Sequence, residues 1–202
     1  MISRKETNPT LDIIIPIYNE EEMIAPLLAK IAAVFSSSEL KSRKIKSVRT
    51  IFIDDGSTDK SAEKIADEIF RGFPAELHRL SRNFGHQNAV SAGFNKTTAD
   101  LVVVMDADLQ DPPEIIYEMI ERWRDGYDVI YGERRKRKEN ILKVICYWFF
   151  YRMLAFLSEI SVPLDSGEFS LVDQRVVKAM LQLPEKLRFP RGLRSWVGFK
   201  QI

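Results

Sequence analysis

Two aspartates one residue apart, Asp106 and Asp108, are the strongest sign of chemistry in the sequence. They directly follow Leu101–Met105, five apolar residues of which three are β-branched, a pattern that predicts a strand buried on both faces. Two carboxylates so close together at the mouth of a buried strand repel each other and lose hydration unless a cation lies between them. The pattern therefore favours a divalent-cation site over the alternative, a solvated acidic turn.

A third aspartate in the same segment, Asp111, has a structural explanation. It precedes Pro112, and Glu114 follows three residues after it, which is the spacing of a helix start with a capping-box-like pair. We therefore expect a helix from Pro112 to about Arg124, with Asp111 at its cap.

The bulk composition is that of one folded globular domain. Of the 202 residues, 45% are hydrophobic and 29% charged, and a net charge of +1 gives no indication of nucleic-acid binding. The single cysteine, Cys146, excludes an internal disulfide and favours a reducing compartment. No signal peptide is recognisable, and the apolar run from Val144 to Tyr151 is much shorter than the roughly 18 residues of a spanning helix.

Strands and helices are expected to alternate along the chain. The predicted strands are residues 11–15, with Pro16 as the break, 48–53, 75–80, 101–105 and 128–131. The predicted helices are residues 21–35, about 59–70, 86–95, 112–124 and 174–183. The first ten residues should be frayed, and residues 36–47 should form a polar connection. This alternation predicts an α/β fold, with a mostly parallel sheet and helices on both faces.

Polar residues gather where the predicted strands end. Ligands of open α/β sheets bind outside the carboxyl ends of the strands. In this sequence those ends carry residues 18–20, 54–57, 82–83, 106–110 and 133–134. The loops at the opposite ends, residues 36–47, 71–74 and 97–100, look like plain connections. Such an asymmetry is what a nucleotide site requires.

Four motifs, in the same order along the chain, resemble those of family 2 glycosyltransferases with the GT-A fold. They are Ile15–Glu20 (IPIYNE), Asp54–Asp59 (DDGSTD), Leu80–Gly85 (LSRNFG) and Met105–Glu114 (MDADLQDPPE). The sequence is most similar to the polyprenyl-phosphate branch, which contains bactoprenol glucosyltransferases and dolichol-phosphate mannose synthases. The resemblance runs from about Leu11 to the last residue. It implies a Rossmann-like GT-A core with a C-terminal amphipathic helical appendage.

The resemblance also implies which residues bind the donor. Residues implied at the nucleotide are Pro16, Tyr18, Glu20, Asp54, Asp55, Ser57, Arg82 and Asp106. Asp106, Asp108 and Gln110 match the family's metal and diphosphate positions and would hold Mg²⁺ or Mn²⁺. Hard cations prefer such oxygen ligands. The cation would neutralise the nucleoside diphosphate as it leaves.

The C-terminal third combines a basic cluster with an aromatic segment. Arg134–Lys138 is a run of five cations, and Ile141–Ile160 carries six aromatic residues at helix-compatible spacing. This combination favours a helix that lies on an anionic membrane surface or in a homo-oligomer interface. The alternatives are a solvated basic loop and aromatic side chains that pack on the sheet.

The acceptor side departs from the family pattern at Gly167–Ser170, where the branch usually has Gly-Asp-Phe-Arg. The candidate catalytic residues are Asp108, Asp165 and Glu168. A lipid phosphate, with a second pKa near about 6, is already largely dianionic at neutral pH. Asp165 and Glu168 are therefore expected to orient a phosphate or cation rather than to act as obligatory bases. Candidates for contact with the diphosphate or the acceptor phosphate are Arg134, Arg137, Arg191 and Arg194.

The sequence hypothesis is an inverting, metal-dependent transfer of a hexose from a nucleotide sugar to polyprenyl phosphate. UDP-glucose is the preferred donor, a formamido-arabinose donor is an alternative, and the location is the cytoplasmic face of the cell membrane. Residues 1–135 would form the nucleotide-sugar core and residues 136–202 an acceptor and membrane-surface segment. In bactoprenol-type relatives two membrane-spanning helices typically follow this point. Two alternatives follow from the resemblance: this sequence ends before such helices, or the natural chain relies on its interfacial helix instead.

Two rival functions remain open at this stage. An aspartate-nucleophile phosphatase also places Asp-x-Asp after a buried strand, although it usually does so on the first strand. A non-catalytic module that binds nucleotide at the membrane surface would retain the same motifs. His78 and His86 lack metal-ligand spacing with any cysteine or glutamate, so neither is predicted to bind zinc.

Overall fold

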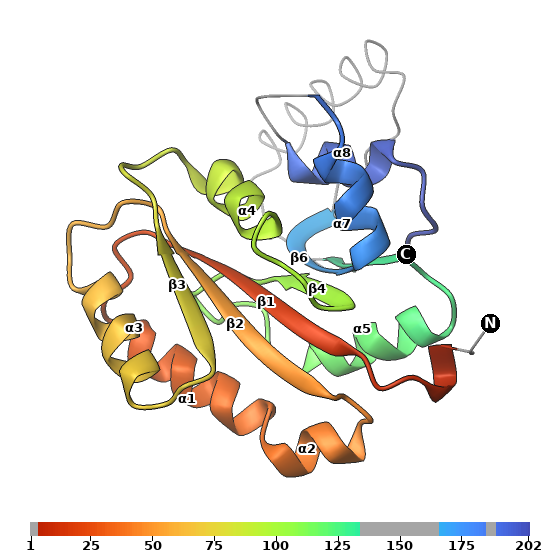
Figure 1. Ribbon diagram of the computed structural model, residues 1–202, viewed down its shortest axis with the longest axis horizontal. Coiled ribbons are helices and arrows are strands. Elements are labelled where there is room, and N and C mark those ends of the chain that lie inside the picture. Colours follow the sequence, from red (N-terminus) through yellow and green to blue (C-terminus); the bar gives the residue numbers. More distant parts are fainter. Residues whose placement is uncertain (1–3, 134–165, 185–188) are drawn as a thin grey trace, which may run out of the picture.

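The computed structural model describes residues 4–133, 166–184 and 189–202, and the observations below concern these ranges. Its strands form one six-stranded sheet in the order β3-β2-β1-β4-β6-β5 (Figure 1). The strands are β1 Thr10–Ile17, β2 Ser47–Asp54, β3 Ala75–Arg79, β4 Leu101–Val104, β5 Val129–Glu133 and β6 Ser166–Asp173. The first four pair in parallel, whereas β6 runs antiparallel to both of its neighbours. The predicted mostly parallel α/β sheet is confirmed.

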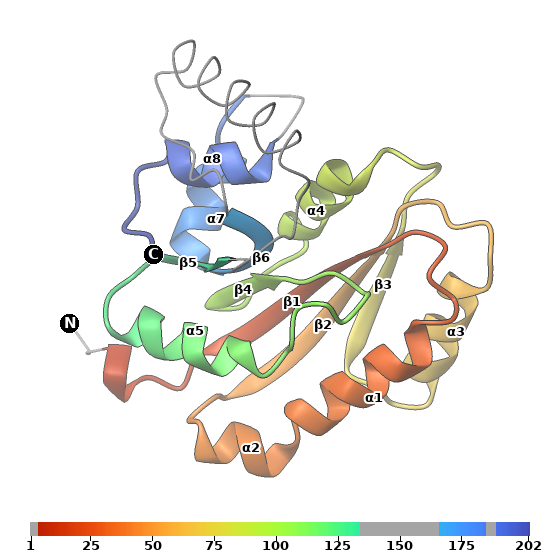
Figure 2. The same cartoon turned by 180° about the vertical axis from the view of Figure 1, so that it is seen from behind.

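Helices cover both faces of this sheet. In Figures 1 and 2, α1, α2, α3 and α5 lie on one face, and α4, α7 and α8 lie on the other. The bounds are η1 Arg4–Glu6, α1 Ile24–Val34, α2 Ser37–Ser42, α3 Ser61–Phe70, α4 His86–Phe94, α5 Ile115–Arg124, α7 Gln174–Leu181 and α8 Pro190–Trp196. Within the described ranges, no helix has the length and apolar character needed to cross a bilayer.

The central strand β1 contributes to two separate cores. Ile13, Ile15 and Ile17 pack in the cluster that includes side chains of α1 and α5. Ile14 packs in the other cluster, with side chains of α4 and α7. Because successive side chains of a strand alternate between faces, a run that is apolar at every position is needed to bury both. This is why the uninterrupted apolar runs were reliable predictors of the central strands.

The strand β1 continues through Pro16 to Ile17, so the predicted break at Pro16 is wrong. Ile14 accepts a hydrogen bond from the N–H of Met105, so residues of this parity face β4. The paired part of β4 ends at Val104. Pro16, two residues after Ile14, therefore faces a position where no β4 partner needs its N–H, and proline is tolerated there.

The strand β6 was not predicted. It inserts antiparallel between β4 and β5, with Val102 opposite Val172 and Val104 opposite Ser170. Its partners are distant in sequence, so no local alternation with a helix announces it. The later part of the chain thus contributes to the sheet itself, and the division near residue 135 remains a proposal about function.

Three further expectations fail locally. The helix α5 begins at Ile115 rather than Pro112, and its cap residue Glu114 makes no side-chain capping bond but pairs with Lys30, so the predicted cap at Asp111 is wrong. Part of the predicted connection forms the short helix α2. The N-terminal segment is anchored, because Arg4 donates to the carboxylate of Asp128 at 2.6 Å.

Candidate functional site

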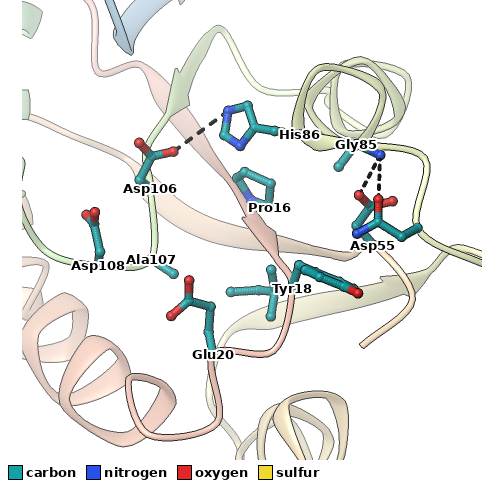
Figure 3. Close-up of a pocket in the computed structure, with 12 residues that line it drawn as sticks. Pro16, Tyr18, Glu20, Asp55, Gly85, His86, Asp106, Ala107 and Asp108 are labelled. Atoms are coloured by element: carbon teal, nitrogen blue, oxygen red, sulfur yellow. Dashed lines mark hydrogen bonds and ion pairs between the residues drawn. The ribbon is translucent and has the colours of Figure 1, made fainter. Parts of the chain in front are cut away.

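A cavity of about 440 Å³ opens at the edge of the sheet where β1, β2 and β4 end (Figure 3). We call this edge, together with the start of β6, the carboxyl edge. The cavity is lined by Pro16, Ile17, Tyr18, Glu20, Asp55, Asn83, Gly85, His86, Ala89, Asp106, Ala107 and Asp108. The structure therefore brings together residues of all four sequence motifs.

The loops after β1 and β2 are locked to each other. The backbone N–H of Asn19 donates to Ser57 Oγ at 3.0 Å, and the side-chain oxygen of Asn19 accepts from the N–H of Thr58 at 2.8 Å. Asn19 has a φ of 54°, a left-handed conformation that asparagine tolerates better than most residues. The N–H of Glu20 donates to Ser61 Oγ at 2.8 Å. These bonds fix the segment that carries Tyr18 and Glu20 at the cavity.

Gly56 is required by the close approach of two loops. Its φ is 76°, and a Cβ at this position would lie 2.6 Å from the carbonyl carbon of Arg82. Only glycine adopts this conformation without strain and lets the loop after β2 touch the loop after β3.

Several predicted nucleotide residues lie behind the cavity. Asp54 is fully buried and accepts from the N–H of Ser57 at 2.9 Å, and Arg79 Nε lies 3.0 Å from its other oxygen. Ser57 is also buried. Asp54 and Ser57 therefore shape the loop and do not line the cavity, whereas Pro16 and Tyr18 do.

Asp55 lines the cavity and also holds the loop after β3. Its two carboxylate oxygens accept from the backbone N–H groups of Phe84 and Gly85, at 2.7 and 2.8 Å. Arg82 is exposed, stacks on the Phe84 ring at 4.0 Å and is not part of the cavity lining. The structure thus gives Asp55 a clear position at the site and places Arg82 outside the cavity.

Three carboxylates at the cavity, those of Glu20, Asp106 and Asp108, have no arginine or lysine partner among the described residues. Burial, followed by the negative charges of Asp108, Asp59 and Asp106, raises the pKa of Glu20. Burial also raises the pKa of Asp106; Asp108 and Glu168 add to this effect, while His86 opposes it. Among the described residues, this cavity is therefore short of positive charge.

The segment after β4 presents the two aspartates of the motif. Asp106 is half-buried, Asp108 is exposed, and Leu109 adopts a left-handed φ of 56°. Asp108 Oδ1 accepts from the N–H of Gln110 at 3.0 Å. Gln110 is exposed and is not part of the cavity lining, so the structure joins only Asp106 and Asp108 of the predicted metal set in the cavity.

The carboxylate oxygens of Asp106 and Asp108 suit a hard divalent cation whose remaining ligands come from the substrate and water. No cluster of three or more histidine, cysteine, aspartate or glutamate side chains suitable for one ion occurs in the described part of the chain. The protein therefore offers the two aspartates, with raised pKa at Asp106 and no cation beside them other than His86. Mg²⁺-type ions commonly take one or two carboxylates and complete their shell with substrate phosphates and water.

Glu168 lies beside this cavity because β6 runs antiparallel to β4. The register pairs Val104 with Ser170, and Glu168, two residues before Ser170, lies close enough to Asp106 for its charge to act on the Asp106 carboxyl. Gln87 Nε2 donates to Glu168 Oε1 at 2.7 Å, and Arg191 Nε lies 2.9 Å from the same oxygen. The predicted candidate Glu168 is thus part of a polar cluster that also contains Arg191.

Arg194 belongs to the same cluster. It is only 5% exposed, and its guanidinium lies 5.4 Å from the centre of the Tyr131 ring. Burial lowers the pKa of Arg194 to about 10, while Glu168 acts in the opposite direction. Within the described part of the chain, its Nε has no hydrogen-bond partner. Arg194 therefore carries a buried charge that its surroundings compensate only in part.

Two side chains at the carboxyl edge are not among the predicted site residues. His86, which has no zinc-ligand spacing, places its Nε2 3.8 Å from Asp106 Oδ1, and Gln87 donates to Glu168. Their position directly after the strand-end motif at Gly85 was the available signal. Arg134, Arg137, Asp165, Cys146 and the aromatic segment 141–160 lie outside the described residues.

Comparison with known proteins gives a consistent family assignment. The sequence profile of glycosyl transferase family 2 matches residues 12–181. The chain is 42% identical over 190 residues to the uncharacterized glycosyltransferase YkcC of Bacillus subtilis, covering 94% of this chain and 57% of that protein. It is 35% identical over 190 residues to the bactoprenol glucosyl transferase of Shigella phage SfX, covering 93% and 60%. The chain thus spans less than two thirds of the length of these relatives.

Solved structures share the fold at low sequence identity. A mannosyltransferase from Pyrobaculum calidifontis, in complex with GDP-Man and Mn²⁺, superposes with a TM-score of 0.68 at 18% identity, covering 98% of this chain and 55% of that one. A glucosyl-3-phosphoglycerate synthase from Mycobacterium tuberculosis, in complex with Mn²⁺, UDP-glucose and phosphoglyceric acid, gives a TM-score of 0.57 at 15% identity, covering 85% and 59%. Both likenesses concern the fold.

Proposed function

Because this chain belongs to glycosyl transferase family 2, we propose that it transfers a hexose from a nucleotide sugar to polyprenyl phosphate. UDP-glucose is the preferred donor. The observation that carries the proposal is the cavity at the carboxyl edge, where Asp106 and Asp108 meet Glu20 without an arginine or lysine partner in the described ranges. A site of this kind suits a cation and the diphosphate that the cation accompanies.

The donor would occupy the cavity with its diphosphate toward Asp106 and Asp108. Mg²⁺ or Mn²⁺ held by these two residues would neutralise the negative charge that develops on the leaving nucleoside diphosphate. The loop bonds of Asn19 and Asp55 keep Tyr18 and the segment at Gly85 in place around the nucleoside. Complexes of two structural neighbours with Mn²⁺ and a nucleotide sugar support this assignment.

The acceptor phosphate would bind on the opposite side of Asp106, at the cluster of Glu168, Arg191 and Arg194. Among the described residues, this cluster holds two guanidinium groups and one carboxylate, and the Nε of the buried Arg194 has no hydrogen-bond partner there. A phosphate dianion would pair with the guanidinium groups. The bactoprenol glucosyl transferases among the relatives support a polyprenyl phosphate as the acceptor.

The chemistry would proceed with inversion. One oxygen of the acceptor phosphate attacks the anomeric carbon as the bond from that carbon to the diphosphate oxygen breaks. A phosphate that is already dianionic at neutral pH has no proton to lose. Glu168 would therefore orient the acceptor and balance Arg191, and Asp165 would assist from outside the described residues.

The same proposal includes the cellular setting. A lipid acceptor requires the enzyme to work at a membrane surface, and a nucleotide-sugar donor favours its cytoplasmic face. The basic residues Arg134 and Arg137 and the aromatic segment 141–160 would contact that surface or a second copy of the chain. The region from residue 136 onward would then serve the acceptor, and residues 1–135 the donor.

The test is a binding titration followed by a transfer assay. UDP is titrated with and without Mn²⁺, and glucose transfer from UDP-glucose to a short-chain polyprenyl phosphate is then measured, with GDP-mannose as the donor control. Mn²⁺-dependent UDP binding with transfer supports the proposal. Binding without transfer to any acceptor would indicate a non-catalytic nucleotide module. Phosphate release without UDP binding would indicate the phosphatase.

A further inference from the structure

The first turn of α4 contacts both carboxylates that flank the proposed reaction centre. His86 and Gln87 are its first two residues. His86 Nε2 lies 3.8 Å from Asp106 Oδ1, at the end of β4, and Gln87 Nε2 donates to Glu168 Oε1 at 2.7 Å, on β6. Two consecutive side chains of one helix thus reach the donor side and the acceptor side of the carboxyl edge.

This helix start is held firmly in place. Asp55 binds the backbone N–H groups of Phe84 and Gly85, immediately before the helix. Further along α4, Gly93 packs so closely on β1 that a Cβ there would lie 2.4 Å from Ile14 Cγ2. Both ends of α4 are thus fixed against the sheet. The position of Gln87 therefore depends on these contacts with the sheet and not on contacts at the protein surface.

Both polar contacts of the Glu168 carboxylate with described residues use the same oxygen. Gln87 Nε2 and Arg191 Nε approach Oε1, at 2.7 and 2.9 Å, which leaves Oε2 without a partner among the described residues. The Glu168 side chain is 16% exposed. One oxygen of the Glu168 carboxylate is therefore fixed by described residues, and the other is not.

The orientation of the Gln87 amide is also determined. If its oxygen and nitrogen were exchanged, a carbonyl oxygen would face the Glu168 carboxylate, and the two acceptors would repel each other. In this orientation Gln87 Oε1 is buried and has no hydrogen-bond partner among the described residues. A buried acceptor without a partner costs stability. The hydrogen bond from Gln87 to Glu168 is therefore made at the cost of an unpartnered Gln87 Oε1 among the described residues.

We infer that Gln87 is a positioning residue that fixes Glu168 Oε1 and thereby presents Oε2 to the acceptor at a set separation from Asp106. The inference rests on the proposed transfer reaction for its functional part. Its structural part, the coupling between Gln87 and Glu168, is independent of which sugar or lipid the enzyme uses. A purely structural glutamine would tie α4 to β6 without any effect on turnover beyond that on folding.

The kinetic test uses three substitutions of similar length. Gln87→Lys keeps an N–H donor, Gln87→Met removes it, and Gln87→Glu places a second carboxylate against Glu168. With UDP-glucose, Mn²⁺ and a short-chain polyprenyl phosphate, we expect kcat to fall about threefold, tenfold and 100-fold, in that order. The affinity of Gln87→Met for UDP with Mn²⁺ should stay within about threefold of the unsubstituted chain. The matched control is Gln182→Met, at an exposed position near the end of α7.

A double-mutant cycle provides the readout that does not depend on activity. Gln87→Met and Glu168→Met are combined, and the unfolding equilibrium is measured in denaturant. We expect the two effects to be non-additive by about tenfold in the equilibrium constant, because each substitution removes the same hydrogen bond.

The outcomes separate the inference from the proposed function. Non-additive unfolding with the kinetic order Lys, Met, Glu supports the positioning role. Additive unfolding, or equal kcat for all three substitutions, overturns it. If the unsubstituted chain transfers no sugar while the cycle is non-additive, the proposed function fails and the coupling between Gln87 and Glu168 stands.

Discussion

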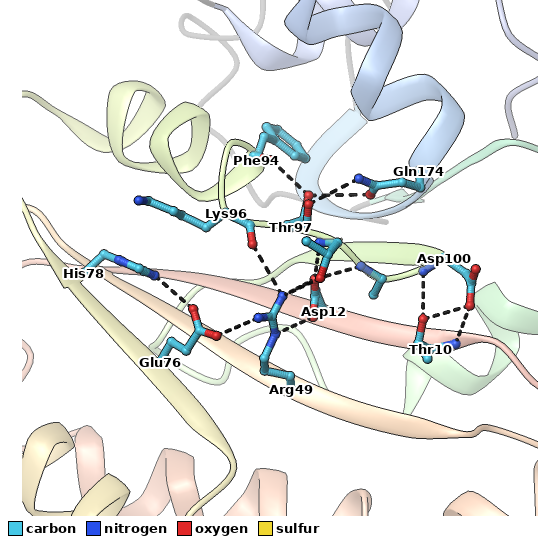
Figure 4. A network of polar contacts seen from close by, with 12 residues as sticks. Thr10, Asp12, Arg49, Glu76, His78, Phe94, Lys96, Thr97, Asp100 and Gln174 are labelled. Atoms are coloured by element: carbon cyan, nitrogen blue, oxygen red, sulfur yellow. Dashed lines mark hydrogen bonds and ion pairs between the residues drawn. The ribbon is translucent and has the colours of Figure 1, made fainter.

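Acidic residues at the two ends of the parallel strands differ in whether a cationic side chain pairs with them. At the amino edge, where β1, β2 and β3 begin, Asp12 is 2% exposed and both of its oxygens are held by Arg49, at 2.9 and 2.7 Å (Figure 4). Arg49 also bonds Glu76, at 2.6 Å. At the carboxyl edge, the one possible cation beside Asp106 within the described ranges is His86, and Asp108 has none there.

This difference separates stability from binding. A buried carboxylate with a bidentate arginine and backbone N–H donors satisfies its own charge and holds strands together. Carboxylates that lie close together at a cavity repel each other. A cation that binds there with a diphosphate would relieve this repulsion, and the free energy gained would favour binding. The charges at the amino edge are therefore paired within the protein, whereas those of Asp106 and Asp108 would be balanced by the ligand proposed above.

Neutralising Asp106 should give the largest effect. We expect Asp106→Asn to weaken Mn²⁺-dependent UDP binding by at least about 100-fold, because one of two charged cation ligands is lost. The free energy of unfolding without ligand should stay the same or rise by up to about 1 kcal/mol, because a desolvated charge is removed. Calorimetric titration and denaturant unfolding measure the two quantities. The control is Asp67→Asn, at an exposed position on α3. A loss of stability with unchanged UDP affinity would contradict the comparison, because Asp106 would then stabilise the fold and not bind the ligand.

Breaking the amino-edge pair should do the opposite. We expect Arg49→Met to lower the free energy of unfolding by about 3 kcal/mol, because Asp12 keeps only its bonds from the N–H groups of Thr98 and Ala99. The affinity for UDP with Mn²⁺ should not change at temperatures where the protein is folded. Arg71→Met, which removes an exposed ion pair with Glu68, is the matched control and should cost less than about 0.5 kcal/mol. Equal losses in the two variants would contradict the comparison.

The amino edge should also dominate acid unfolding. Although burial acts to raise it, hydrogen bonds from Arg175 and Trp123 hold the pKa of Asp173 below its ordinary value of 3.8. The associated stability is present above pH 3.8 and is lost as the pH falls through the lower folded-state pKa. We expect Asp173→Asn to lower Tm by about 6 °C at pH 6, with a difference that vanishes near about pH 2. Thermal scans across this pH range measure it, and a constant difference would show that the charge of Asp173 is not responsible.

The smallest effect is expected at the rim of the carboxyl edge. Burial and the neighbouring charges of Asp108, Asp59 and Asp106 raise the pKa of Glu20, so its ionised form is disfavoured in the folded protein. Because solvent screens this partly exposed group, we expect Glu20→Gln to stabilise the ligand-free protein by only about 0.5 kcal/mol at low salt. The gain should shrink by more than half at about 1 M salt, where the Debye length is near 3 Å. A gain that persists at high salt would point to packing instead of repulsion.

The donor side of the site was largely predictable from the sequence. A strand such as Leu101–Val104 is recognisable from its own residues, and the residues after it must lie at its carboxyl end. The same rule brought Tyr18, Asp55 and Asp106 to one edge before any coordinates were known, and the cavity contains all three. Local pattern did not separate Asp55, which lines the cavity, from its buried neighbour Asp54, because burial depends on the loop that packs over it.

The acceptor side was decided by tertiary structure. The sequence by itself determined the family, the alternation of strands and helices, and the acidic pair at the end of β4, because each depends on residues close together in the chain. Only the tertiary structure placed β6 antiparallel beside β4, which brings Glu168 close to Asp106, brings Gln87 to the Glu168 carboxylate and buries Arg194. The physical reason is that register between strands more than 60 residues apart is set by pairing and by burial on both faces of the sheet, and no local pattern encodes it.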